Sequence, residues 1–223
     1  MALNLIMLGP PGAGKGTQAE KFGREKGLPK ISTGDILREA VQSGTEMGLQ
    51  AKAVMDRGEL VDDETMVAIV RERLTRPDAD AGFILDGFPR TVDQARALDR
   101  IIDERGKGSL IVVDIVVPDE ELVRRLAGRR ICSKCGENAG PADGATCLRC
   151  GGELTQRPDD SEVVVLERLR VYTRSTKPLV DHYRVRPTFR TVNGAQAPDL
   201  VARELETTID DAASVGSRAG IGA

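Results

Sequence analysis

The chain has 223 residues, of which 40% are hydrophobic and 30% charged, a balance that suits one large domain with a substantial core. Its formal net charge of −3 argues against binding nucleic acid or a membrane surface through bulk charge. No apolar run approaches the length of a membrane span and the N-terminus lacks a secretion signal, so we expect a cytoplasmic protein that binds neither membrane nor nucleic acid.

A glycine-rich loop, Gly9 to Thr17, follows a predicted strand at 3–8 and precedes a predicted helix at 15–26. Such a loop aims backbone N–H groups and a helix N-terminus at one point, where they can hold a phosphate, and Lys15 adds a positive charge. Gly16 takes the hydroxyl position of the pattern G-x-x-x-x-G-K-[ST], which leaves direct magnesium ligation by a hydroxyl open. A plain surface turn is the alternative. The predicted phosphate-binding residues are Gly12, Ala13, Gly14, Lys15, Gly16 and Thr17.

The rest of the chain alternates between strand and helix patterns. We predict strands at 30–31, 83–86, 110–117 and 188–192, helices at 34–43, 47–57, 62–75, 91–105, 118–127, 161–183 and 198–213, and a frayed tail at 214–223. This alternation predicts an α/β fold: a five-stranded parallel sheet flanked by helices on both faces, with ligands at the carboxyl ends of its strands. Asp86 ends a strand at that edge, where it can organise magnesium through water; capping of a nearby turn is the alternative.

All four cysteines lie in a segment, 128–160, that is rich in Gly, Pro and charge. Cys132 and Cys135 form one close pair, and Cys147 and Cys150 form the second after eleven intervening residues. Four thiolates at this spacing can close on one tetrahedral ion, which predicts a structural zinc site; iron in the same sulfur cage is the alternative. With few large apolar side chains, the segment needs metal ligation in order to fold.

Five motifs together resemble the adenylate kinases of the long type, which carry a metal-bearing lid. They are the loop at 9–17, Ile-Ser-Thr-Gly-Asp at 31–35, Leu-Asp-Gly-Phe-Pro-Arg at 85–90, Gly-Arg-Arg at 128–130 and Arg-Pro-Asp-Asp at 157–160. The resemblance implies a P-loop nucleoside monophosphate kinase-like fold in a monomer. It also implies magnesium-dependent, reversible transfer of a phosphoryl group from ATP to AMP, which gives two ADP.

The resemblance implies a division of the chain as well. The core would comprise 1–31, 62–127 and 161–223, with an AMP-binding insertion at 32–61 and an ATP lid with the metal knuckles at 128–160. Hinges of the lid would lie at Gly128, Asp159 and Asp160. Covers that close only over both substrates would keep water from the γ-phosphate.

Arginines suit phosphoryl transfer because a planar guanidinium grips two oxygens at once; for each one alone, a solvent-facing side chain is the alternative. The resemblance implies catalytic roles for Lys15, Asp86, Arg90, Arg125, Arg129, Arg157 and Arg168. It implies that ATP is bound by Gly12 to Thr17, Arg125, Arg129 and Gln196. It implies that AMP is bound by Thr33, Gly34, Arg38, Glu59, Leu60, Val61, Gly87, Arg90, Gln94, Arg157 and Arg168.

Gln94 bears on the acceptor base, since its amide can present a donor and an acceptor to one edge of adenine. By resemblance, the related pyrimidine nucleotide kinases carry Asn at this place. A kinase of UMP, CMP or another nucleoside monophosphate is the alternative. From a different class, the alternative is a nucleotide-dependent zinc-knuckle binding protein, although the chain lacks an Asn-Lys-x-Asp element for guanine and a basic stripe for nucleic acid.

Overall fold

The computed structural model describes residues 2–139, 144–157 and 161–219. The strands are β1 (Leu3–Leu8), β2 (Lys30–Ser32), β3 (Gly82–Asp86), β4 (Leu110–Val116), β5 (Arg130–Cys132), β6 (Asn138–Ala139), β7 (Leu154–Gln156) and β8 (Phe189–Asn193). The helices are α1 (Lys15–Lys26), α2 (Thr33–Gln42), α3 (Glu46–Asp56), α4 (Asp63–Leu74), α5 (Val92–Arg105), α6 (Asp119–Ala127), α7 (Glu162–Val171), α8 (Pro178–Arg184) and α9 (Pro198–Ala219). A 3₁₀ turn at Pro77–Ala79 and a π-turn at Tyr172–Thr176 complete the description.

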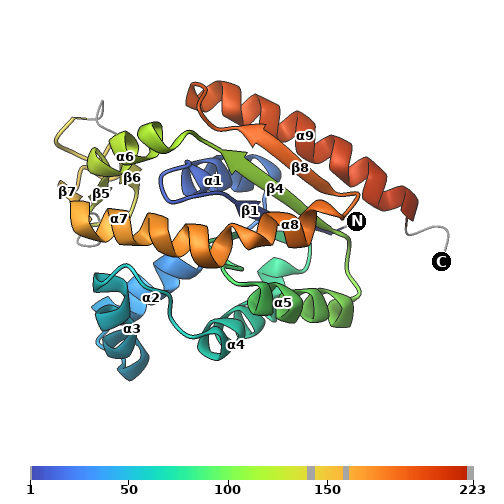
Figure 1. The fold of residues 1–223 in the computed structure, drawn as a ribbon, viewed down its shortest axis with the longest axis horizontal. Coiled ribbons are helices and arrows are strands. Elements are labelled where there is room, and N and C mark those ends of the chain that lie inside the picture. Colours follow the sequence, from blue (N-terminus) through green and yellow to red (C-terminus); the bar gives the residue numbers. More distant parts are fainter. Residues whose placement is uncertain (1, 140–143, 158–160, 220–223) are drawn as a thin grey trace.

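The main sheet has five parallel strands in the order β2-β3-β1-β4-β8, which confirms the predicted fold class. Figure 1 shows β4 between β1 and β8. The chain places β2 and β3 on one side of β1, and β4 and β8 on the other. The strand order therefore switches direction at β1. In open α/β sheets, ligands bind at the carboxyl ends of the strands beside such a point. The glycine loop lies there because it directly follows β1.

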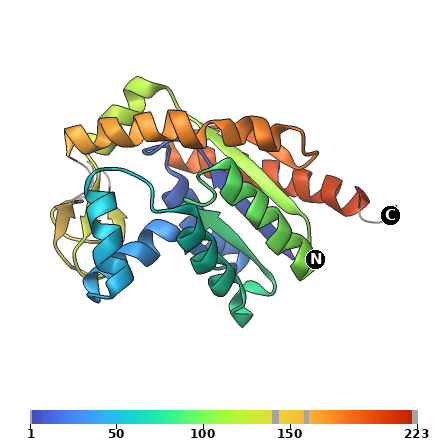
Figure 2. The ribbon, with the colours of Figure 1, turned by 60° about the horizontal axis from the view of Figure 1, so that its bottom comes forward.

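Both faces of the sheet are apolar and covered by helices. Along β1, Leu5 and Met7 pack on the face shared with α1 and α9, whereas Ile6 and Leu8 pack on the face shared with α4, α5 and α8. Figure 2 shows α4 and α5 in front of the sheet and α9 behind it. The period of two in a strand sends alternate side chains to opposite faces, so a strand such as β1, apolar apart from the buried Asn4, contributes to two cores.

Helix α9 is attached to α1 by polar contacts as well as by packing. The Gln18 side chain, which is buried, donates from Nε2 to the backbone oxygen of Pro198 over 2.9 Å, at the start of α9. Two ion pairs follow along the helices, Lys21 with Asp199 at 2.8 Å and Lys26 with Glu206 at 2.7 Å. The start of α9 is thus held against the helix that follows the glycine loop.

The predicted helix at 161–183 is interrupted, so the expectation of one continuous α-helix is wrong. Helix α7 ends at Val171, the π-turn follows, and Pro178 begins α8. Proline has no N–H to donate and its ring clashes with the preceding turn of an α-helix. The helix forms a wider turn instead: Lys177 N donates to Tyr172 O over 2.8 Å, and this spacing of five residues is that of a π-helix.

The prediction of a frayed tail from residue 214 is wrong, because α9 continues from Pro198 to Ala219. Ala212 is fully buried, and a Cβ placed on Gly216 would lie 3.2 Å from Ser109. The small residues of this region therefore pack closely against the core, a tertiary contact that their composition does not reveal. Residues 220–223 lie outside the described residues.

Between α6 and α7, the described residues form a second sheet, antiparallel and ordered β6-β5-β7. Its strands have two or three residues each, too few to show an alternating pattern in the sequence. Gly128 lies at the entrance of this segment, directly after α6. Asp159 and Asp160, the other predicted hinge residues, lie outside the described residues, as does Pro158 of the same motif.

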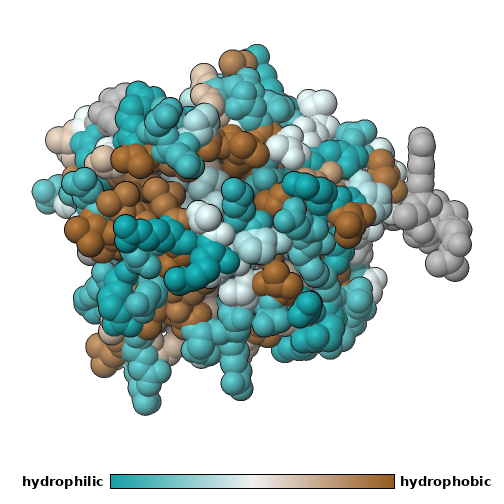
Figure 3. Space-filling model, viewed as in Figure 1, coloured by the Kyte–Doolittle hydropathy of each residue, from teal (hydrophilic) through white to brown (hydrophobic). Residues whose placement is uncertain are grey.

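The molecular face seen in Figure 3 is mostly hydrophilic, and apolar side chains gather over α7 at its left. Among the side chains of α7, Val163 and Leu166 are exposed, whereas Val165 is buried. Within the described ranges, we find no helix that combines the length and the apolar composition needed to span a membrane.

Candidate active site

The glycine loop turns back over the carboxyl end of β1. Gly14 caps α1 with φ of 91°, a left-handed conformation that residues with a Cβ rarely adopt. The Lys15 ammonium donates to the backbone oxygens of Gly9 and Pro10, over 2.7 and 2.9 Å. These contacts hold the positive charge over the loop, next to the N-terminus of α1.

Gly16 is explained by a close approach between the loop and β3. A Cβ at this position would lie 3.0 Å from Asp86 Oδ2, so a serine or threonine would meet the carboxylate. Asp86 therefore lies against the first turn of α1. Thr17, the residue that carries the displaced hydroxyl, is exposed one position further along.

The electrostatic surroundings of Lys15 are strongly positive. Burial lowers the pKa of Lys15 to about 8; Asp86 raises the pKa, and the nearby Arg90, Arg168 and Arg129 lower it. Lys15 and these three arginines gather positive charge beside the glycine loop. Such a cluster attracts polyanions, so this part of the site favours phosphate.

A cavity of about 820 Å³, here called the loop pocket, opens over the glycine loop. Its volume lies within the range of small-molecule and cofactor sites. The residues predicted to bind ATP all line it: Gly12, Ala13, Gly14, Lys15, Gly16, Thr17, Arg125, Arg129 and Gln196. Asp86 and Arg157 line it as well. Glu121 of α6 accepts from Arg125 Nε over 2.8 Å, and hydrogen bonds from Arg124 and Arg125 lower the pKa of Glu121 to about 2.

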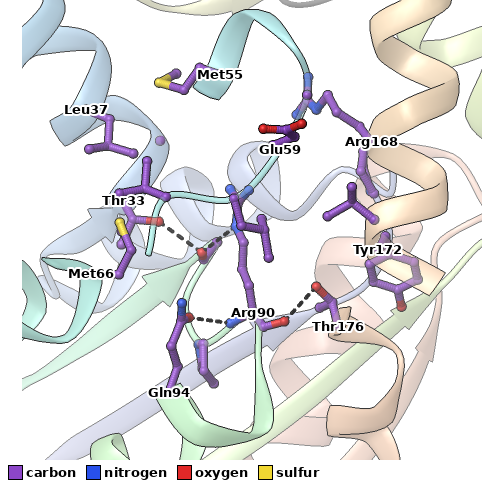
Figure 4. Close-up of a pocket in the computed structure, with 18 of the residues that line it drawn as sticks. Thr33, Leu37, Met55, Glu59, Met66, Arg90, Gln94, Arg168, Tyr172 and Thr176 are labelled. Carbon is purple, nitrogen blue, oxygen red and sulfur yellow. Dashed lines mark hydrogen bonds between the residues drawn. The ribbon is translucent and has the colours of Figure 1, made fainter. Parts of the chain in front are cut away.

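A second cavity, the Gln94 pocket, lies between α2, α4, α5 and the α7–α8 joint (Figure 4). The predicted AMP-binding residues that line it are Thr33, Gly34, Arg38, Glu59, Leu60, Val61, Gly87, Arg90, Gln94 and Arg168. Arg157, predicted with them, lines the loop pocket instead. Thr33 Oγ1 and Arg90 Nε both donate to Gly87 O, over 2.9 and 2.8 Å, and Thr176 Oγ1 donates to Arg90 O over 2.9 Å.

Both ends of the Gln94 amide make hydrogen bonds. Oε1 accepts from Arg90 N over 2.7 Å (Figure 4), and Nε2 donates to Asp63 Oδ1 over 2.8 Å. Thr91 Oγ1 donates to Asp63 Oδ2 over 2.7 Å and accepts from Gln94 N over 3.2 Å. Although it lines the pocket, Gln94 is only 1% exposed, so its amide is held in one place by these partners.

Four cationic side chains line both pockets: Lys15, Arg38, Arg90 and Arg168. The two cavities therefore meet at a shared cluster of positive charge. Two phosphate-bearing ligands, one in each pocket, would bring their phosphates to this cluster. Such an arrangement can stabilise the negative oxygens that gather when a phosphoryl group passes between two molecules.

The four cysteine thiols converge, with all Sγ atoms within 4.8 Å of one another. Cys132 Sγ and Cys150 Sγ are 3.5 Å apart, and Cys135 Sγ and Cys147 Sγ are 3.6 Å apart. A tetrahedral zinc ion with Zn–S bonds of about 2.3 Å needs sulfurs about 3.8 Å apart, so the donor set fits. Backbone N–H groups of Cys135 and Lys134 lower the pKa of Cys132, whereas the neighbouring thiols and burial raise the pKa of Cys135.

Sequence reasoning missed several polar residues at the two pockets. Asp63 and Thr91 hold Gln94, Thr176 holds the backbone of Arg90, and Asn138 accepts a hydrogen bond from Arg157 Nη2. Asp63 and Thr91 had a local signal, because each lies at the start of a predicted helix. Thr176 had none, since it faces the pocket only through the π-turn.

Comparisons with known proteins agree on one family. The family model described as Adenylate kinase matches residues 7–188. An adenylate kinase of Archaeoglobus fulgidus is 51% identical over 213 residues, which are 93% of this chain and 98% of that protein. Adenylate kinases of Geobacillus sp. and Methanothrix thermoacetophila are 50% and 48% identical, over 91% and 93% of this chain and 96% and 98% of theirs. With this fold, this glycine loop and this identity over nearly its whole length, the chain belongs to the adenylate kinase family.

Proposed function

We propose that this adenylate kinase transfers a phosphoryl group reversibly from ATP, bound in the loop pocket, to AMP, bound in the Gln94 pocket, and releases two ADP. The observation that carries the proposal is the set of four cations lining both pockets. We propose a monomer as the working unit, because one chain brings the predicted ATP-binding residues to one pocket and all but one of the predicted AMP-binding residues to the other.

In this reaction the protein positions the two nucleotides and stabilises charge. Lys15 and the loop N–H groups grip the outer phosphates of ATP, Arg38 and Arg90 grip AMP, and Arg168 reaches the transferring group. Arg125, Arg129 and Arg157 cover the triphosphate from the lid side. No side chain needs to act as a general base with a shifted pKa. The only histidine, His182, lies beside Asp99 of α5 and lines neither pocket.

Magnesium bound with ATP would neutralise part of the charge of the phosphates. Asp86 is the carboxylate of this chain that fits such an ion, because it lies against the first turn of α1 at the rim of the loop pocket.

Residues 32–61 and 128–160 are proposed as the two covers of the site. The first contributes Arg38, Glu59 and Leu60 to the Gln94 pocket, and the second contributes Arg129 and Asn138 to the loop pocket. Covers of this kind exclude water from the transferring phosphoryl group, so AMP rather than water receives it.

Separate substitutions test the assignment of the two pockets. Arg129→Ala should raise KM for ATP by about 10- to 100-fold with little change in KM for AMP, because Arg129 lines only the loop pocket. Arg38→Ala should raise KM for AMP more than KM for ATP. Arg71→Ala, which removes an exposed arginine paired with Glu104 on α4 and α5, is the matched control. Steady-state assays of ADP formation measure all three, and equal losses for both nucleotides in Arg129→Ala would contradict the assignment.

We propose zinc as the ion of the four cysteines, and its removal is a second test. Chelation should make amide hydrogens of 130–139 and 144–157 exchange about tenfold faster or more, with the main sheet unaffected, because ligation replaces an apolar core there. The catalytic efficiency for ATP should fall at the same time, since this segment carries Asn138 and Arg157. Native mass spectrometry identifies the ion and separates zinc from iron. A metal-free chain with unchanged exchange would contradict the site.

A further inference from the structure

The amide of Gln94 is oriented by two partners of opposite character. A carboxylate can only accept hydrogen bonds and a backbone N–H can only donate, so Nε2 must face Asp63 and Oε1 must face Arg90 N. In the reversed amide, Oε1 would meet the Asp63 carboxylate and Nε2 would meet the N–H of Arg90. Chemistry thus selects one orientation of a side chain that is otherwise symmetrical in shape.

Thr91 determines how Asp63 meets Gln94. The Thr91 hydroxyl accepts from Gln94 N, so its proton is directed to Asp63 Oδ2. The other carboxylate oxygen, Oδ1, is left for Gln94 Nε2. A closed ring of hydrogen bonds therefore joins the start of α4 to the start of α5. Only a side chain that accepts at both ends can satisfy Thr91 and Gln94 together.

These contacts leave part of the amide free for a ligand. A primary amide has two N–H donors and two acceptor lone pairs, and Asp63 and Arg90 use one of each. One N–H and one lone pair remain on a residue that lines the pocket. Adenine carries an exocyclic amino donor beside a ring-nitrogen acceptor, which this amide can match. In a 6-oxopurine the donor and the acceptor are exchanged, and the match requires the reversed amide.

We propose that Asp63 is a positioning residue that determines the specificity for the acceptor base. By holding Gln94 in one orientation, it selects 6-aminopurine over 6-oxopurine monophosphates without touching the base itself. The inference rests on the proposed AMP site in the Gln94 pocket. The Gln94 amide could bind either kind of purine if it were free to rotate by half a turn. The contact with Asp63 explains why it recognises only one.

The substitution Asp63→Asn tests the proposal. The Thr91 hydroxyl still donates to residue 63, so the asparagine oxygen faces Thr91 and its NH₂ group faces Gln94, which favours the reversed amide. The N–H of Arg90 still favours the original orientation of the Gln94 amide. The preference for AMP over IMP should therefore decrease without reversing. The probes are AMP and IMP, which differ in the 6-substituent and the N1 proton. We expect the ratio of kcat/KM for AMP to that for IMP to fall by about tenfold or more.

Two further variants exclude a merely structural role. Asp62→Asn changes the adjacent residue, which caps α4 by accepting from Thr65 N, and should leave the AMP-to-IMP ratio unchanged. Asp63→Ala removes the carboxylate without supplying a donor, so its ratio should fall less than that of Asp63→Asn. A structural role predicts the reverse order, with the alanine variant the more damaged for both substrates. If Asp63→Asn lowers kcat/KM for AMP and for IMP by the same factor, the ratio is unchanged and the proposal is overturned.

Gln94→Leu separates failure of this inference from failure of the AMP site. If it removes the preference for AMP over IMP and Asp63→Asn does not narrow it, Gln94 reads the base and Asp63 has no part in specificity. If Gln94→Leu leaves the preference intact, the assignment of the base to this pocket fails, and the inference about Asp63 fails with it.

Discussion

Replacing Lys15 by methionine is expected to lower kcat by about 10³-fold or more, the largest effect of any single substitution in this chain. Lys15 is one of the four cations that line both pockets, and its ammonium lies over the glycine loop. Removal of one group that stabilises charge in a transition state costs orders of magnitude in rate. A coupled assay with ATP, AMP and magnesium measures the loss.

The same substitution should leave thermal stability unchanged or raise it. The pKa of Lys15 falls from 10.5 to about 8 in the folded protein, so its charged form is less favourable there than in the unfolded chain. Between these pH values the unfolded chain binds more protons, so the free energy of unfolding rises with pH; below about pH 8 the full cost of the buried charge remains. Methionine removes that cost. A melting temperature that falls together with kcat would mean that Lys15 is needed for the fold.

A pH profile supplies the control. Bound phosphates should raise the pKa of Lys15, so ATP binding takes up a proton above about pH 8, and affinity should fall as the pH rises further. Methionine does not titrate, so Lys15→Met should lose this dependence while keeping the wild-type AMP affinity within a small factor. Calorimetric titration with ATP at pH 7 and pH 9 distinguishes the wild type from Lys15→Met. The same decline in both proteins would show that another group titrates.

Arg168→Lys should give the second large effect, a fall in kcat of about 10²- to 10³-fold with small changes in KM for both nucleotides. Lysine keeps the charge and loses the planar fork, and Arg168 lies where the two pockets meet. An interaction made chiefly in the transition state appears in kcat, whereas ground-state binding appears in KM.

The matched control for Arg168 is Arg170→Lys, in the same helix. Arg170 is exposed and paired with Glu167, so its replacement should leave both constants within about twofold. An Arg168→Lys enzyme with normal kcat and a KM raised tenfold for one nucleotide would show that Arg168 grips a bound nucleotide and does not act on the transferring group.

The parts of the molecule that sequence could predict are those with a local physical cause. The loop from Gly9 to Thr17 needs glycine because of its own backbone, and paired cysteines need only their own spacing to converge. The inner strands β1 and β4 are apolar on both faces apart from the buried Asn4 and Asp114, so they appear as mostly apolar runs. Pro178 was also a local signal, and it should have divided the predicted helix at 161–183.

What could not be predicted depends on residues far apart in the chain. Asp63 meets Gln94 across 31 positions, and the ring that they form with Thr91 exists only when α4 packs against α5. Thr176 reaches Arg90 across 86 positions. Hydrogen bonds of this kind leave no periodic pattern, because each residue taken alone reads as an ordinary polar side chain at the start or end of a helix.

The attachment of α9 to α1 has a consequence for motion during turnover. The loop pocket is bordered on one side by Ala195 to Pro198 and on another by Arg129 and Asn138. The first border is joined to α1 through the Gln18–Pro198 hydrogen bond and two ion pairs, so we expect it to keep its place beside the glycine loop. The opening that admits ATP or releases ADP should then come mainly from displacement of the second border.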